Sequence, residues 1–198
     1  MDLKVLLVEK EDCDAGTVQQ IRNGLAEDNS QYGVLRDATE VLKKKLEGAR
    51  PEQLNKLHLK IGLSLFFLGH PSQAIEHLRQ AESTLANFYL GRALLGKKEY
   101  PEALDAFERA EKGGYTASQV HLQKVAVYRE SGNIKDANAT LAKLADMASH
   151  SAEYHFQKGS LASKDGHFTQ AIESFEQAIK LDPGHTGALF ELARANDY

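Results

Sequence analysis

The sequence is poor in cysteine, in proline and in long apolar runs, which respectively cross-link a chain, kink its helices and anchor it in a membrane. Its 198 residues include no tryptophan, four prolines and one cysteine, Cys13. A single cysteine cannot form an internal disulfide, so an oxidising compartment is not required. No apolar run approaches the roughly 20 residues of a membrane-spanning helix. The apolar stretch 3–8 is too short for a signal-peptide core, and acidic residues follow it at once. These absences favour a soluble, cytoplasmic protein that does not enter a membrane.

An excess of one charge is also missing. Lys and Arg total 24 against 28 Asp and Glu, so the formal net charge is −4 and the sequence pI is ≈ 6.1. This balance leaves no excess of positive charge to attract the phosphates of a nucleic acid, so direct nucleic-acid binding is not expected. Hydrophobic residues make up 42% of the chain, which is enough for a buried core.

What the sequence does have is a recurring stripe of small and bulky residues. In the stretch 167–185, Ala171, Phe175 and Ala178 are spaced by four and three. Positions three and four apart share one face of a helix, so these residues form a stripe with a small residue at each end. Asp182 and Pro183 then end the helix, because proline cannot donate the helical hydrogen bond and restricts the residue before it. The stretch predicts one helix of a tightly packed hairpin.

The stripe recurs with a period close to 34 residues. Its first alanine stands at Ala74, Ala103, Ala137 and Ala171, giving intervals of 29, 34 and 34. A glycine lies twelve residues before three of these alanines, inside another apolar-periodic segment. A second glycine lies five residues before three of them and separates the two segments. Two helices per period of 34 residues predict a solenoid, in which each hairpin buries its face against its neighbours.

Two stretches, YLGRALLGKKEYPEALDAFERA (89–110) and FQKGSLASKDGHFTQAIESFEQAIKLDP (156–183), resemble the tetratricopeptide repeat (TPR). The resemblance implies an all-α fold, a right-handed TPR superhelix of antiparallel helical hairpins. No unit has the opening tryptophan of the family, and only the fourth has the closing proline. The resemblance implies four TPR units at about 55–83, 84–117, 118–151 and 152–185 within 55–185, followed by the first helix of a truncated fifth unit at 186–198.

Residues 1–54 fit the repeat less well. They are interpreted as an N-terminal segment plus a degenerate TPR-like hairpin, with helices expected over 17–28 and 32–46. The stretch LKVLLV at 3–8 fits no repeat. A short strand or a capping segment is expected there.

No residue cluster indicates chemistry. His58, His121 and His155 share one repeat position in successive units, too far apart to meet around one ion, and packed imidazoles are the preferred interpretation. His77 is interpreted with His70 as a pair on a helix surface. Acidic neighbours of Cys13 would raise its thiol pKa, which disfavours a nucleophile. No phosphate loop, dinucleotide fingerprint or nucleophile elbow occurs. The sequence therefore predicts no enzyme, no metal site, no cofactor and no small-molecule substrate.

The TPR resemblance implies recognition instead, because the first helices of successive hairpins line a concave groove in that family. The expected partner is a protein or peptide. The groove is expected to be apolar at its N-terminal end and polar with mixed charge towards its C-terminal end. A partner anchor is expected at Leu63, Phe67, Phe88 and Arg92, since aromatic and Arg residues dominate interface energetics. The partner-binding groove residues implied by the resemblance are Leu59, Leu63, Phe66, Phe67, Phe88, Arg92, Leu122, Arg129 and Phe156.

One TPR function is excluded by the residues. The carboxylate clamp for chaperone tails needs Lys, Asn and Arg at set positions of three successive repeats. Neither register of this chain supplies that set. The first register has Leu59, Leu63, Tyr89, Gln119 and Gln123.

A narrower resemblance comes from LRDA, FYLGRALL, GGY and GALFELARAND. These motifs resemble the N-terminal TPR half of bacterial proteins whose longer members end in a domain similar to the C-terminal domain of the RNA polymerase α subunit. That resemblance implies a transcription-linked scaffold. The alternative is a targeting or regulatory arm of an enzyme whose catalytic domain lies beyond residue 198. The sequence after Tyr198 in a longer protein distinguishes the two.

The last segment has an apolar stripe with nothing to cover it. Leu189, Phe190, Leu192 and Ala193 occupy apolar positions of a helix over 186–198, and no second helix follows. An exposed Leu or Phe side chain lacks roughly 1.5–3 kcal/mol of stabilisation that its burial would contribute. We expect a weak homodimer through 186–198, or a frayed end in a monomer.

Overall fold

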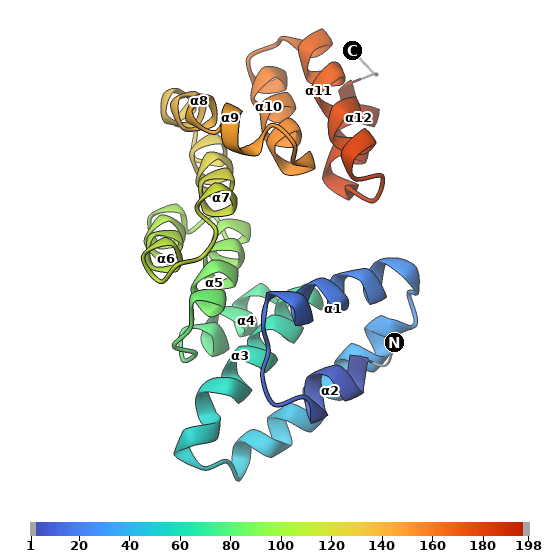
Figure 1. Cartoon of the computed structure of the whole chain (residues 1–198), viewed down its shortest axis with the longest axis vertical. Helices are drawn as coiled ribbons and strands as arrows, with labels where there is room; N and C mark the ends of the chain where they lie inside the picture. The colour runs from blue at the N-terminus through green and yellow to red at the C-terminus, as the bar shows by residue number, and fades with distance from the viewer. Residues whose placement is uncertain (1–2, 196–198) are drawn as a thin grey trace. The chain divides into compact units, whose positions relative to one another are not determined.

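The computed structural model describes residues 3–195, which contain helices and no strand (Figure 1). The expected all-α class is confirmed. None of the described helices is long and apolar enough to cross a membrane. The elements are η1 (Val5–Glu9), α1 (Ala15–Glu27), α2 (Gln31–Glu47), α3 (Pro51–Phe67), α4 (Pro71–Leu78), α5 (Thr84–Gly96), α6 (Tyr100–Lys112), α7 (Ala117–Glu130), α8 (Ile134–Lys143), α9 (Ala145–Ala148), α10 (Ala152–Lys164), α11 (Phe168–Leu181) and α12 (Thr186–Ala195).

The chain divides into two compact units, one ending at Tyr115 and one beginning at Thr116. In the first unit, α3 pairs with α4 and α5 pairs with α6. In the second unit, α7 pairs with α8, α10 pairs with α11, and α12 packs on α11. The hairpins are therefore built from neighbouring helices, as the repeating stripe predicts.

Each of three hairpins closes because a glycine in its first helix receives a bulky side chain from its second. A Cβ atom placed on Gly91 would lie 2.7 Å from the ring of Phe107, and one on Gly159 would lie 2.7 Å from the ring of Phe175. Both rings are fully buried. Gly62 receives Leu78 in the same way. Because glycine has no side chain, the two helices of each hairpin pack closely enough for one bulky side chain to fill the space between them.

The turns inside the hairpins need a left-handed residue. Gly132 and Gly166 have φ angles of +83° and +78°, a region that residues with a Cβ rarely adopt. Lys98 takes the corresponding place between α5 and α6 with φ +61°. The glycines that separate the two segments of each period in the sequence are therefore turn residues.

His58 belongs to the core of the first hairpin, and its partner was not foreseen. The Nδ1 atoms of His58 in α3 and His77 in α4 lie 3.0 Å apart. Burial lowers the pKa of both imidazoles, so at neutral pH one neutral ring donates to the other. The interpretation of His77 as a surface partner of His70 is wrong, because α4 turns His77 inward against α3. Within residues 3–195, no group of three or more His, Cys, Asp or Glu side chains is placed to hold a metal ion.

The N-terminal elements include a short helical segment before the two expected helices. Residues 3–9 are helical rather than extended, and Leu3 and Leu7 are fully buried. α2 packs along α3 and η1 packs on α2. α1 diverges from α2 after their short connection (Figure 1). The two helices expected in this region form as α1 and α2, and α2 also packs against α3 and η1.

Candidate functional site

The nine predicted groove residues divide between the two units and fall into two burial classes. The first unit holds six of them and the second unit three. Five side chains are partly exposed: Phe66, Phe67, Arg92, Arg129 and Phe156. Four are buried, with exposed fractions of 7% for Leu59, 0% for Leu63, 6% for Phe88 and 3% for Leu122.

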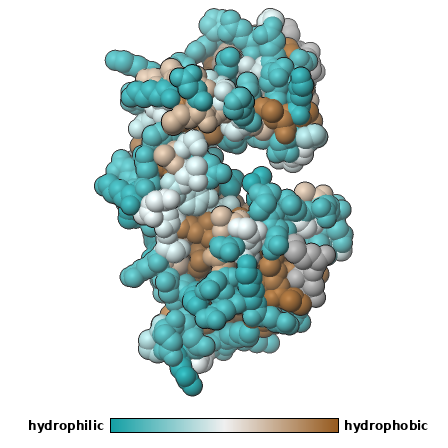
Figure 2. All heavy atoms as spheres, viewed as in Figure 1, coloured by the Kyte–Doolittle hydropathy of each residue, from teal (hydrophilic) through white to brown (hydrophobic). Residues whose placement is uncertain are grey.

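In the first unit, partly exposed and buried aromatic side chains lie around the guanidinium of Arg92. The Cζ atom of Arg92 lies 5.0 Å from the ring centroid of Phe66 and 5.4 Å from that of Tyr89. Phe66 also lies edge-on to Phe67, with centroids 5.4 Å apart. These are cation–π and edge-to-face distances. Figure 2 shows an apolar patch over the α4–α5 region of this unit. Tyr89 is 4% exposed, so it supports the cluster from the core.

Two of the expected anchor residues lie in the core instead of on the groove surface. Phe88 stacks on Tyr115, with ring centroids 4.1 Å apart and an interplanar angle of 12°, and it also contacts Phe107. Leu63 has no exposed surface. Their side chains are covered by parts of the same chain, so the expectation that Leu63 and Phe88 offer surface to a partner is corrected.

The N-terminal segment lies against α3. Eight consecutive residues of α3, His58–Leu65, are buried, which is more than two helical turns and leaves no face open. Lys60 donates from Nζ to the backbone carbonyl of Lys10. Lys56 Nζ lies 2.7 Å from a carboxylate oxygen of Glu11 and 2.9 Å from one of Asp12, and these hydrogen bonds raise the pKa of Lys56 to about 12.

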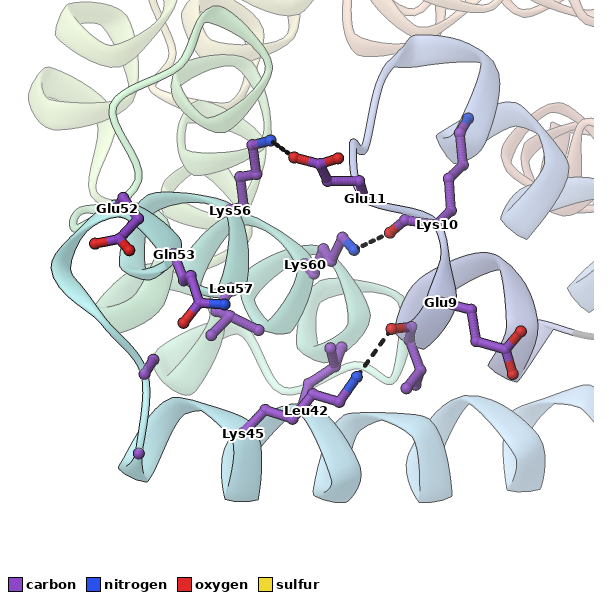
Figure 3. Close-up of a pocket in the computed structure, with 13 residues that line it drawn as sticks. Glu9, Lys10, Glu11, Leu42, Lys45, Glu52, Gln53, Lys56, Leu57 and Lys60 are labelled. Carbon is purple, nitrogen blue, oxygen red and sulfur yellow. Dashed lines mark hydrogen bonds and ion pairs between the residues drawn. The ribbon is translucent and has the colours of Figure 1, made fainter.

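A cleft of ≈ 710 Å³ lies beside these contacts, between the N-terminal segment, α2 and α3 (Figure 3). Lys45, Lys56 and Lys60 point into this region from the two helices. Leu42 and Leu57 form part of its apolar lining. The sequence alone did not single out this cleft.

The second unit has a cleft of a different character, with a volume of ≈ 590 Å³. It lies among α7, α10, the start of α11 and α12. Several lining residues occupy groove positions of the repeat, and their charges are mixed as expected from the sequence. Its lining residues are Arg129, Glu130, Ser160, Ser163, Lys164, Phe168, Glu191, Arg194 and Ala195.

Arg129 is held in place on several sides. Its side chain is 14% exposed, and one terminal nitrogen lies 3.2 Å from the carboxylate of Glu130. Its Cζ atom lies 5.9 Å from the ring centroid of Phe156. Lys164 donates from Nζ to the backbone carbonyl of Arg129. Phe156 itself packs between His185 and Phe175, so one predicted groove residue supports another. Leu122, in contrast, joins the core between α7 and α8.

Two polar atoms at this cleft lack partners. Within residues 3–195, neither Arg129 Nε nor Ser160 Oγ has a hydrogen-bond partner, although both atoms are buried. Leaving a buried polar group unpaired costs about 1–3 kcal/mol. A ligand that brings a carbonyl or carboxylate oxygen to Arg129 and a hydrogen-bonding group to Ser160 would recover that free energy. The TPR resemblance also implies a groove position for Ser160, but nothing in the sequence shows that its hydroxyl lacks a partner.

Comparison with known proteins identifies the repeat. Two family models of the tetratricopeptide repeat match residues 59–117 and 152–185. No curated protein matches the chain. Among solved structures, MamA is similar with 22% identity, a TM-score of 0.61, and coverage of 80% of this chain and 95% of that chain.

Two further solved structures are similar over most of their length. TTC0263, a thermophilic TPR protein from Thermus thermophilus, has 17% identity, a TM-score of 0.66, and coverage of 91% of this chain and 100% of that chain. YrrB, described as a TPR protein with an unusual peptide-binding site, has 18% identity, a TM-score of 0.57, and coverage of 96% of this chain and 97% of that chain. At these identities the likeness shows the fold.

Proposed function

Because the chain is a tetratricopeptide repeat protein, we propose that it is a non-catalytic scaffold that binds a peptide or partner segment through its groove positions. The observation that supports this proposal is the cleft of the second unit, where Arg129 Nε and Ser160 Oγ are buried without partners. Three cationic side chains and two carboxylates line the cleft. An extended peptide backbone offers carbonyl acceptors and N–H donors at short spacing, and it suits such a mixed lining.

The free energy of the unpaired groups makes the proposal testable with two variants. We expect peptides selected from a phage-displayed random library against the unchanged chain to bind about 10-fold more weakly to Ser160→Ala and to Arg129→Ala, a loss of about 1.4 kcal/mol. Ser160→Ala removes an unpaired hydroxyl, so it is expected not to lower the free energy of unfolding. Fluorescence anisotropy measures the first quantity and urea denaturation the second.

The matched control is Ser174→Ala. Ser174 is a buried serine of α11, outside the cleft lining, whose hydroxyl donates to the carbonyl of Gln170. Its replacement is expected to leave peptide affinity unchanged. Peptides that bind Ser160→Ala and Arg129→Ala as tightly as the unchanged chain would refute the role of this cleft.

We further propose weak self-association through α12. Leu189 and Phe190 are 45% and 64% exposed, whereas Leu192 packs against the core around Phe175. In a two-fold symmetric dimer, this patch of one copy contacts the same patch of the other copy, so assembly stops at two copies. Residues 196–198 of the segment lie outside the described residues.

Sedimentation velocity at several concentrations tests the self-association. The sedimentation coefficient of the unchanged chain is expected to rise with concentration, because dimers bury Leu189 and Phe190. The variant with Leu189→Ser and Phe190→Ser is expected to show no such rise. A concentration-independent monomer of the unchanged chain would refute the dimer.

The cellular location and the identity of the partner stay proposals that come from the sequence alone. A cytoplasmic location and a transcription-linked partner rest on composition and on the narrower resemblance. The alternative is a targeting arm of an enzyme. A short helical domain following Tyr198 in a longer protein would support the transcription link, and a long α/β domain would support the alternative.

A further inference from the structure

The first unit has a groove whose occupant is part of the chain itself. Residues 10–14, KEDCD, are acidic overall and follow the apolar helical turn η1. The surface of α2 and α3 beside them carries an excess of positive charge, because Lys45, Lys56 and Lys60 line the cleft against one carboxylate, Glu52 (Figure 3). The charges of the segment and of this surface are complementary.

Two of the polar contacts to the segment go to its backbone. Lys45 donates from Nζ to the backbone carbonyl of Val8 over 3.0 Å, and Lys60 donates to that of Lys10. The last carbonyls of a helical turn lack partners within the turn, so any such turn offers acceptors of this kind. Lys56 pairs with the carboxylates of Glu11 and Asp12. These two carboxylates are largely exposed, and exposed ion pairs add little to stability.

The N-terminal segment also contacts α1. Leu3 approaches Gly24 of α1, since a Cβ on Gly24 would lie 3.3 Å from the Leu3 side chain. One stripe of α1 is buried, namely Val18, Ile21 and Leu25. Burial raises the pKa of the Tyr89 and Tyr115 hydroxyls, and the nearby charge of Arg22 in α1 opposes this rise. Arg22 is therefore near enough to these two hydroxyls for its charge to act on them.

We propose that the surface of α2 and α3 beside this cleft is a docking site for an acidic segment that follows an apolar helical turn, and that residues 3–12, which form the facing wall of the cleft, are its resident, exchangeable occupant. This site lies in the first unit and does not rest on the cleft at Arg129. A partner with the same pattern competes with the N-terminal segment. The buried ammonium of Lys60, which now donates to a neutral carbonyl, would gain more from a carboxylate.

A peptide supplied in trans tests the exchange. The probe is a labelled synthetic peptide with the sequence of residues 1–14, and the receptor is the full chain with Leu3→Ser and Leu7→Ser, which weakens the hold of the resident segment. We expect this variant to bind the peptide at least about 10-fold more tightly than the unchanged chain. The apparent affinity is proportional to the fraction of chains in which the resident segment has left the docking site, and the variant raises that fraction. Circular dichroism establishes that the variant is folded.

Charge variants show where the peptide binds. Adding Lys45→Glu and Lys56→Glu to the receptor is expected to abolish binding. Lys43→Glu is the matched control, since Lys43 of α2 pairs with Glu40 and does not line the cleft, and it is expected to leave binding unchanged. A folded Leu3→Ser/Leu7→Ser chain that does not bind the peptide, or that binds it equally after the two lysine reversals, would overturn the proposal.

Hydrogen exchange on the unchanged chain keeps the proposal testable if the leucine variant does not fold. Exchangeable docking predicts that the amides of residues 5–10 exchange faster than the core amides of α3, through a local opening that leaves α3 protected. Equal exchange rates in the segment and in α3 would mean that residues 3–12 are an inseparable part of the core, and would overturn the proposal.

Discussion

Replacing Phe107 with alanine is expected to lower the free energy of unfolding by about 3–5 kcal/mol. The ring has no exposed surface and fills the space that Gly91 leaves between α5 and α6. It also lies edge-on to Phe88, with centroids 5.8 Å apart. The loss combines the lost burial of the ring with a cavity that helices on both sides cannot easily close. Urea denaturation followed by circular dichroism measures the change.

The control for this prediction is the same exchange at an exposed ring. Phe190 of α12 is 64% exposed, so Phe190→Ala is expected to cost less than about 0.5 kcal/mol, as surface substitutions usually do. A loss below about 1 kcal/mol for Phe107→Ala would contradict the packing described for the α5–α6 hairpin, because a filled core site costs several times more.

Replacing Gly91 with alanine is expected to destabilise the first unit by about 1–3 kcal/mol, although alanine is the better helix former. The added Cβ would lie 2.7–2.8 Å from three atoms of the Phe107 ring, and that ring is buried and cannot move aside. Thermal or urea unfolding of the variant measures the loss. The second replacement, Phe107→Leu, is expected to restore part of it in the double variant, because neighbouring sites couple.

Gly96 at the end of the same helix is the matched control. A Cβ there meets nothing within 4 Å, so Gly96→Ala is expected to stabilise the chain by about 0.5–1 kcal/mol through the lower entropy of the unfolded state. If both replacements change stability in the same direction and by the same amount, the glycine at position 91 is not required for close helix approach.

The sequence by itself determined the repeating hairpin. A stripe such as Ala171, Phe175 and Ala178 specifies which face of its own helix is buried, and Gly159 shows where a neighbour comes close. Left-handed turn residues such as Gly166 mark where each hairpin reverses. All of these signals act within about 20 residues of each other, and local spacing along a helix is readable without knowing what else the chain packs against.

Only the tertiary structure decided which groove positions are open. Leu63 and Phe88 have the residue types of an exposed anchor, yet the structure buries both, and Tyr115 covers the ring of Phe88. The N-terminal segment closes over α3 through contacts between residues about 45–50 positions apart in the sequence. The unpaired state of Ser160 likewise depends on which side chains surround it. Burial and hydrogen-bond satisfaction are sums over all neighbours in space, so no local pattern of the sequence could specify them.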